Sequence, residues 1–149
     1  MPGALCRPSG DKKMSSKPPS SPEAAGIRTI KSPDSFAGTV SRLTSALQSH
    51  GIKIFASIDQ QAEAAAVGLA MPPITLILFG SPKAGTPLMI AQPASALDLP
   101  LKIAVWTSDN GEVYVSVNTT EYLIARHRLP AALAANLAPA EKIIAAALQ

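Results

Sequence analysis

The spacing of hydrophobic residues changes several times along the chain, and its first clear pattern is helical. Four apolar residues share one helical face: Phe36, Val40, Leu43 and Leu47. Ser32-Pro33-Asp34 precedes them with a capping hydroxyl, a proline suited to the first helical position and an acid near the positive end of the helix dipole. Gly51 follows His50, where a left-handed residue commonly ends a helix. We therefore predict a helix from Ser32 to His50.

Alternating apolar and polar residues predict strands in other segments. Gly26 to Lys31 (GIRTIK) predicts a short first strand. A second strand is predicted from Ile52 to Ile58, with its isoleucines turned toward the core. Ile74 to Phe79 (ITLILF) is apolar on both faces, which predicts a central strand buried on both sides or covered by a partner chain. Asp109-Asn110-Gly111 favours a hairpin with a primed turn, joining strands over Leu101–Thr107 and Glu112–Asn118.

The remaining segments predict helices. Asp59 can cap an alanine-rich helix over Gln60–Val67. Further helical segments are expected at Thr86–Ala91, Ala94–Leu97, from the capping-box-like Asn118-x-x-Glu121 to about Arg128, and at Ala131–Leu148 with an interruption at Pro139. The hairpin and short connections favour antiparallel pairing. We predict an α+β fold: a single two-layer domain whose largely antiparallel five-stranded sheet has helices packed on one face.

Composition divides the chain into two parts. A length of 149 residues suits one domain. Residues 1–25 are rich in Pro, Ser, Lys and Gly and are expected to be disordered, ahead of a domain over 26–149, and Met14 would be a natural start codon. The net charge of +3 comes from Met1–Lys31, which carries +4, whereas the rest carries −1. The domain therefore has no charge pattern for binding nucleic acid.

No sequence feature indicates a membrane or an oxidising compartment. Cys6 is the only cysteine, so an internal disulfide is excluded, and no apolar stretch precedes it to form a secretory signal. The longest apolar run, Ile74 to Phe79, is far shorter than the ~20 residues of a membrane helix. We expect a soluble cytoplasmic protein without membrane contact.

The stretch FGSPKAGTPLM contains the most distinctive candidate site. Its two glycines have the spacing of a nucleotide-binding Walker loop, but Thr86 follows the second glycine where lysine is required, which excludes nucleotide hydrolysis. If a helix begins near Gly85, the amides of Gly85 and Thr86 and the ammonium of Lys83 could hold a small anion. The alternative is a simple turn with a solvated lysine.

Few residues could support catalysis. His50 is explained as a helix C-terminal residue. His127 is the better acid/base candidate, with a surface or interface histidine as the alternative, and Asp59 and Glu63 lie one helical turn apart. Cysteines and histidines are too few for a metal cluster, so no metal or cofactor is expected. Met89 is expected in the core or in the lining of a pocket.

Several words of the sequence resemble the domain-of-unknown-function 302 family of prokaryotic proteins. They are GIKIFASID, LILFGSPKAGTPLM and Leu97–Lys102, and the resemblance covers about residues 27 to 128. It implies a small α+β domain that tends to pair as a homodimer, with no established reaction. Relatives commonly have a histidine after the acid at Asp59, where this chain has Gln60. The resemblance therefore argues against an enzyme that depends on that histidine.

Together these observations predict a non-catalytic, homodimeric domain that binds a small anionic ligand. Six residues are assigned to the site: Asp59, Lys83, Gly85, Thr86, Met89 and His127. One alternative is a small enzyme that uses Asp59 or His127 as acid/base. Another is a purely structural dimer that pairs through the strand Ile74–Phe79 or its neighbours.

Overall fold

The computed structural model describes residues 24–149. The segment expected to be disordered lies almost wholly outside this range, as does Met14. The strands are β1 (Ile27–Lys31), β2 (Lys53–Asp59), β3 (Ile74–Gly80), β4 (Leu101–Thr107) and β5 (Val113–Asn118). The helices are α1 (Phe36–Ser49), α2 (Gln60–Ala66), α3 (Pro82–Ala91), α4 (Thr120–Arg126) and α5 (Ala134–Ala147). Single 3₁₀ segments, η1 (Pro93–Asp98) and η2 (Ala131–Leu133), follow α3 and precede α5.

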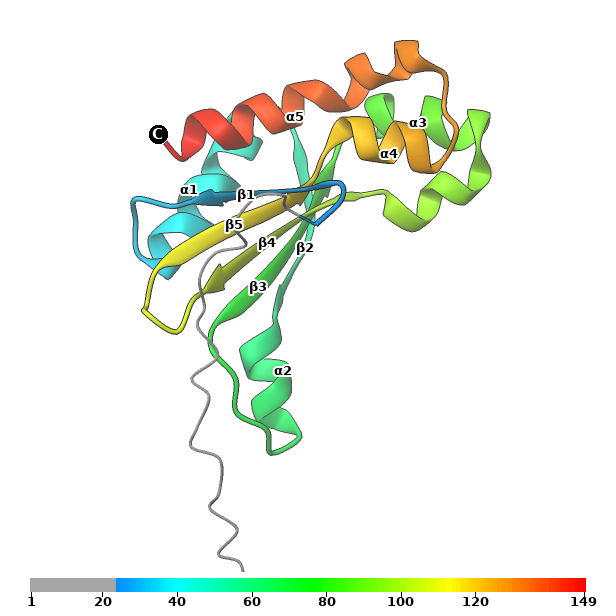
Figure 1. Cartoon of the computed structure of the whole chain (residues 1–149). Coiled ribbons are helices and arrows are strands. Elements are labelled where there is room, and N and C mark those ends of the chain that lie inside the picture. The colour runs from blue at the N-terminus through cyan, green and yellow to red at the C-terminus, as the bar shows by residue number, and fades with distance from the viewer. Residues whose placement is uncertain (1–23) are drawn as a thin grey trace, which may run out of the picture.

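The strands form one sheet in the order β1-β5-β4-β3-β2, and every neighbouring pair is antiparallel. Helices α1 and α5 pack side by side against one face, as Figure 1 shows. The core lies between these two helices and the sheet. It is made by alternate strand residues and by apolar residues of both helices, among them Leu43, Ile77, Val105, Val115 and Ile144. The predicted two-layer α+β fold is confirmed.

The other face of the sheet, called the open face below, is not part of that core. In register, Ile74 lies opposite Trp106, Leu76 opposite Ala104, and Leu78 opposite Lys102, so these side chains share one face. All six remain partly exposed, whereas Ile77 and Phe79 on the alternate positions are buried. The prediction that β3 is buried on both sides within the chain is wrong, because helices cover only one side of the sheet.

A β-bulge in β2 changes which way its isoleucines face. Ile54 lies opposite Phe79 and contacts the core, but the register shifts at Phe55. Beyond the shift, Ile58 lies opposite Leu76, on the open face. One extra residue reverses the side-chain alternation of the rest of the strand. The expectation that the isoleucines of β2 all face one core is therefore wrong for Ile58.

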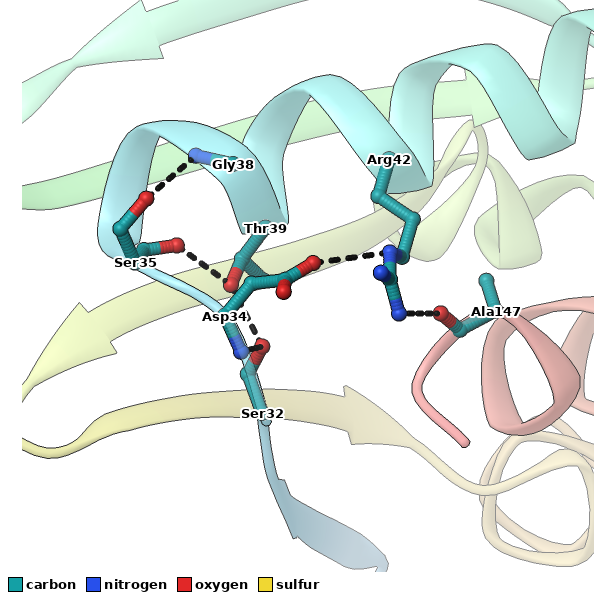
Figure 2. A network of polar contacts seen from close by, with 7 residues as sticks. All are labelled: Ser32, Asp34, Ser35, Gly38, Thr39, Arg42 and Ala147. Carbon is teal, nitrogen blue, oxygen red and sulfur yellow. Dashed lines mark hydrogen bonds and ion pairs between the residues drawn. The ribbon is translucent and has the colours of Figure 1, made fainter.

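Helix α1 begins three residues later than predicted. Ser35 is its N-cap, and its Oγ accepts a hydrogen bond from the amide of Gly38 at 3.1 Å. The hydroxyl of Ser32, the expected cap, instead lies 2.5 Å from the buried Thr39 Oγ1 (Figure 2). The end of the helix is as predicted, with His50 as C-cap and Gly51 at φ +73°.

Arg42 ties the start of α1 to the end of the chain. Its Nε lies 2.8 Å from Asp34 Oδ2, and its Nη1 donates to the carbonyl of Ala147 at 3.3 Å, both drawn in Figure 2. The guanidinium group adds a positive charge beside the C-terminal carbonyls of α5, where it is favourable. The hydrogen bond to Ala147 adds a polar contact to the apolar packing between the two helices that cover the core.

Three further local predictions need correction. The hairpin is present, but only Gly111 has positive φ, and its amide bonds to Ser108 O at 2.9 Å, so a type I turn followed by a left-handed glycine replaces the primed turn. Thr119, not Asn118, caps α4, and its Oγ1 accepts from the amide of Tyr122 at 3.3 Å. Helix α5 continues through Pro139 without interruption.

Candidate functional site

The described residues line a partly open cavity of about 700 Å³ where α3 and α5 meet the end of the sheet. Its walls are mostly carbon. The larger apolar side chains among its lining are Ile52, Phe55, Phe79, Met89, Leu137 and Ile143. Another side is formed by Leu99 and Pro100, which connect η1 to β4, and by Leu101, the first residue of β4. The cavity lies next to the core, because Phe79 belongs to both.

Local sequence explains how α3 comes to border the cavity. Pro82 occupies the first turn, where its fixed φ is suited to a helix and its missing N–H is not needed. The helix therefore begins at Pro82, and not at Thr86 as predicted. Gly85 lies inside it, and a Cβ there would be 3.9 Å from Leu99 Cδ1 and 4.0 Å from Met89 Cε, an ordinary contact distance. The glycine leaves space that a larger side chain would fill.

A few polar groups interrupt the apolar lining. They come from His50, Ser81, Thr86 and Asn136. Ser81 is the N-cap of α3, but its side chain makes no capping hydrogen bond. His50 Nδ1 lies 2.8 Å from the carbonyl oxygen of Ala46, which can only accept, so Nδ1 carries the proton and Nε2 is an acceptor in the neutral ring. The cavity thus combines apolar walls with a small number of hydrogen-bonding groups.

The structure brings three of the predicted site residues together and separates the others. Gly85, Thr86 and Met89 line the cavity. Lys83 is exposed and outside its lining. Asp59 is at the far end of β2, opposite Thr75, where its Oδ1 accepts from the amide of Ala62 at 3.0 Å as the N-cap of α2.

The backbone donors expected at Gly85 and Thr86 are not available to an anion. The amide of Gly85 donates to the carbonyl of Ser81 at 2.9 Å. Thr86 lies in the second turn of α3, where amides bond to carbonyls four residues earlier. The predicted arrangement is wrong because the helix begins four residues before the expected start, which moves both amides into its interior.

His127 belongs to a separate polar cluster. Its Nε2 is 2.5 Å from Asp98 Oδ2, and Arg126 Nη1 is 2.8 Å from the same oxygen. The His127 side chain is only 8% exposed, so it is neither a surface histidine nor part of the cavity lining. The cluster joins the end of α4 to the end of η1.

The clearest electrostatic perturbation lies far from the cavity, on the β5 side of the sheet. Tyr114 Oη donates to Glu112 Oε2 at 2.6 Å, and Lys31 Nζ lies 3.0 Å from Glu112 Oε1. The hydrogen bond from Tyr114, together with Lys31, lowers the pKa of Glu112, and the same bond raises the pKa of Tyr114.

Within residues 24–149, no three His, Cys, Asp or Glu side chains gather where they could hold a metal ion.

Sequence reasoning missed most of the cavity lining. Phe55 was assigned only a position in a strand, and His50 only a helix end. Asn136 lies in an alanine-rich helix that carried no signal of a site, and its Nδ2 donates to Ala84 O at 3.1 Å. Phe55 is the one lining residue that the sequence could have marked as unusual. The isoleucines of this segment alternate with Lys53, Phe55 and Ser57, so Phe55 is a large apolar residue at a position expected to be polar.

Comparison with known proteins places the chain in a family. The family model described as "Domain of unknown function DUF302" matches residues 28–148. The chain belongs to this family. A crystal structure of an uncharacterized conserved DUF302 protein from Bacillus stearothermophilus has a TM-score of 0.71 and 21% identity, covering 84% of this chain and 97% of that one. The resemblance stated from the sequence is confirmed, and the DUF302 fold extends through α5.

The chain is also similar to parts of longer proteins. Over 105 residues it is 37% identical to the fluoride-specific ion channel FluC 1 of Brucella suis biovar 1. The matched stretch covers 70% of this chain and 41% of the channel. The FluC 1 channel of Brucella abortus biovar 1 gives the same identity and covers 39% of its length. The chain thus spans about two fifths of these curated relatives. In residues 24–149, none of the helices has the length and apolar character to cross a membrane.

Proposed function

We propose that this DUF302 domain binds, in its cavity, a small organic ligand with an apolar body and one polar or anionic group. The observation that carries the proposal is the lining, in which apolar side chains surround the hydroxyls of Ser81 and Thr86 and the ring of His50. A volume of about 700 Å³ falls within the range typical of small-molecule sites. Transfer of the apolar body out of water supplies the affinity, and the polar groups orient it.

This proposal changes the ligand expected from the sequence. A small anion held by charge requires cations or several free amides. Lys83 is outside the lining, and the amide of Gly85 is already bonded to Ser81. Contact with carbon therefore contributes more than charge, and the polar end of the ligand needs only one or two hydrogen bonds.

The same reasoning argues against fluoride as the ligand. A small, strongly hydrated anion loses much of its hydration on entering a cavity, and it needs cations or N–H donors in exchange. The walls here are mostly carbon, and Lys83 is not among them. The similarity to fluoride channels therefore does not carry the ion over to this cavity.

Dye binding tests the proposal. Anilinonaphthalene sulfonate has aromatic rings and one anionic group, so its fluorescence should rise saturably with the full chain. Gly85→Leu fills the space beside Leu99 and Met89 and should weaken binding about tenfold or more. Ala91→Leu, at an exposed position of α3 outside the lining, is the matched control and should bind as the parent does.

The uncharged phenylnaphthylamine separates the two parts of the proposal. Its binding should be weaker than that of the sulfonate if His50, Ser81 or Thr86 recognises the polar group.

Equal loss of dye binding in Gly85→Leu and Ala91→Leu, or no saturable binding at all, would contradict the cavity as the site. Native mass spectrometry of freshly purified protein would show any ligand that is retained through purification.

A second candidate function is acid/base catalysis at His127. The observation that favours it is the contact between His127 Nε2 and Asp98 Oδ2, since a carboxylate that orients a histidine is common in active sites. Nδ1 would then exchange the proton. If an activity screen finds a reaction, His127→Ala should lower its rate by about 10² to 10⁴. Asp59→Asn, which keeps a capping side chain, should not change it, and an unaffected rate in His127→Ala would exclude this role.

A further inference from the structure

The cavity changes character between its opening and its inner end. Five of its lining residues are exposed to solvent and therefore mark the opening: His50, Phe55, Pro82, Thr86 and Pro139. At the inner end, the apolar side chains of Phe79, Leu137 and Ala140 are buried. A ligand with an apolar body therefore buries that body against the inner residues and leaves its polar group at the opening.

Basic side chains gather around this opening. Lys53 Nζ lies 4.9 Å from the centre of the Phe55 ring. Lys83 in α3 and Lys142 in α5 are exposed, and each lies about one helical turn from an exposed lining residue of the same helix. None of these three lysines forms an ion pair within residues 24–149, whereas Lys102 of β4 donates to a backbone carbonyl of η1. The three charges are therefore available to attract an anion.

No carboxylate offsets these charges at the opening, since the lining contains neither Asp nor Glu. Of the elements that border the cavity, β2, η1 and α5 each carry one acid. Asp98 of η1 is paired with Arg126. Glu141 Oε1 of α5 accepts from the amide of Thr120 at 2.8 Å, and Asp59 lies at the far end of β2. The opening therefore favours a negatively charged group.

His50 is the only lining residue whose side chain can gain a positive charge. Its Nδ1 is bonded to the carbonyl oxygen of Ala46, which leaves Nε2 for a ligand. The C-terminal end of α1 favours a positive charge on the ring, and Arg42, the only charged residue of that helix, is paired with Asp34. An imidazole takes up a proton in the range of about pH 5 to 8, and its Nε2 then donates to an anion.

We propose that the ligand is an organic carboxylate whose apolar body lies at the inner end of the cavity and whose carboxylate binds protonated His50 at the opening. The inference rests on the proposed function, and it specifies the charge of the polar group, its position and the pH dependence of binding. Affinity should rise as the pH falls, because the protonated ring adds both a donor and a charge. Ammonium groups stay charged over this range, so the three lysines add attraction at every pH used.

Competition against the uncharged phenylnaphthylamine tests the ligand class. Octanoate and octanol have the same chain length and differ in charge, and a carboxylate is ionised throughout this pH range. Between about pH 8.5 and about pH 6, the affinity of the full chain for octanoate relative to octanol should rise about fivefold or more. Lys53→Gln should lower this ratio at both pH values. Arg28→Gln, which removes a charge from β1 at the opposite edge of the sheet, is the matched control and should leave it unchanged.

Two substitutions test His50 itself. His50→Gln should remove the pH dependence of the ratio, because glutamine stays neutral. His50→Lys should keep the high ratio at both pH values, because an ammonium is charged at both. Circular dichroism of each variant would confirm that it is folded.

A ratio that does not change with pH in the parent, or an unchanged pH dependence in His50→Gln, would overturn this inference. Saturable binding of phenylnaphthylamine would then still support the cavity as a ligand site. Absence of saturable dye binding by the parent would overturn both proposals. Equal loss in Lys53→Gln and Arg28→Gln would overturn the attraction assigned to the lysines at the opening.

Discussion

Gly26→Ala should lower the free energy of unfolding by about 3 kcal/mol or more, which is a large part of the stability of a domain this size. Gly26 has φ +78°, and a Cβ at this position would lie 2.1 Å from Tyr122 Cγ and 2.6 Å from Tyr122 Cβ. These atoms are close to the backbone of α4, so rotation of the tyrosine side chain cannot relieve the overlap. The Gly26 carbonyl also accepts from the amide of Thr119 at 2.8 Å, which holds β1 close to α4. Urea denaturation would measure the loss.

Gly51→Ala separates the overlap from the backbone strain. Gly51 has φ +73° but no atom within 4 Å of the added Cβ, so this variant should lose only the left-handed strain of about 1 to 2 kcal/mol. In a Tyr122→Gly background, which also removes the Cβ of residue 122, Gly26→Ala should cost no more than Gly51→Ala does. Equal losses in the two single glycine variants would show that the close approach to Tyr122 contributes nothing.

Phe79→Ala should lower the free energy of unfolding by about 3 to 5 kcal/mol, as for other buried aromatic residues. Phe79 is 2% exposed and packs in the core beneath α1 and α5. It also lines the cavity, so its removal enlarges that space instead of letting the core collapse. Chemical denaturation should therefore show a lower midpoint with an unchanged slope.

Phe55→Ala is the matched control, because Phe55 lines the same cavity but is 43% exposed. Its loss of stability should stay below about 1 kcal/mol, because a half-exposed side chain removes less apolar surface from water on folding. Dye binding should nevertheless weaken, because Phe55 lines the cavity. A comparable stability loss in both variants would contradict the assignment of Phe79 to the core and Phe55 to the site alone.

Signals that act within a few residues were read correctly from the sequence. Gly51 ends α1 with positive φ, Asp59 caps α2, and Asp109-Asn110-Gly111 turns a hairpin. The N-cap of α1 was misplaced from the sequence, which assigned it to Ser32. Ser35 caps the helix, and the Ser32 hydroxyl instead lies beside the buried hydroxyl of Thr39.

The candidate site was predictable only in part. Gly85, Thr86 and Met89 line one cavity because they lie close together on a single helix, α3. Asp59 lies far from them, since it ends the strand whose beginning borders the cavity. His127 was paired with Asp98 by the way α4 packs against η1, a contact between residues 29 positions apart.

The sequence by itself determined the order of elements, the antiparallel sheet and the family. Periodicity, capping and turn chemistry could be read because they act over a few neighbouring residues. Only the tertiary structure decided that FGSPKAGTPLM borders an apolar cavity instead of an anion site. It also decided that the bulge at Phe55 turns Ile58 to the open face. Both outcomes depend on which distant residues pack together and on the exact residue where a helix begins or a register shifts, and a shift of one to four residues is enough to reverse the chemistry that a side chain or amide presents.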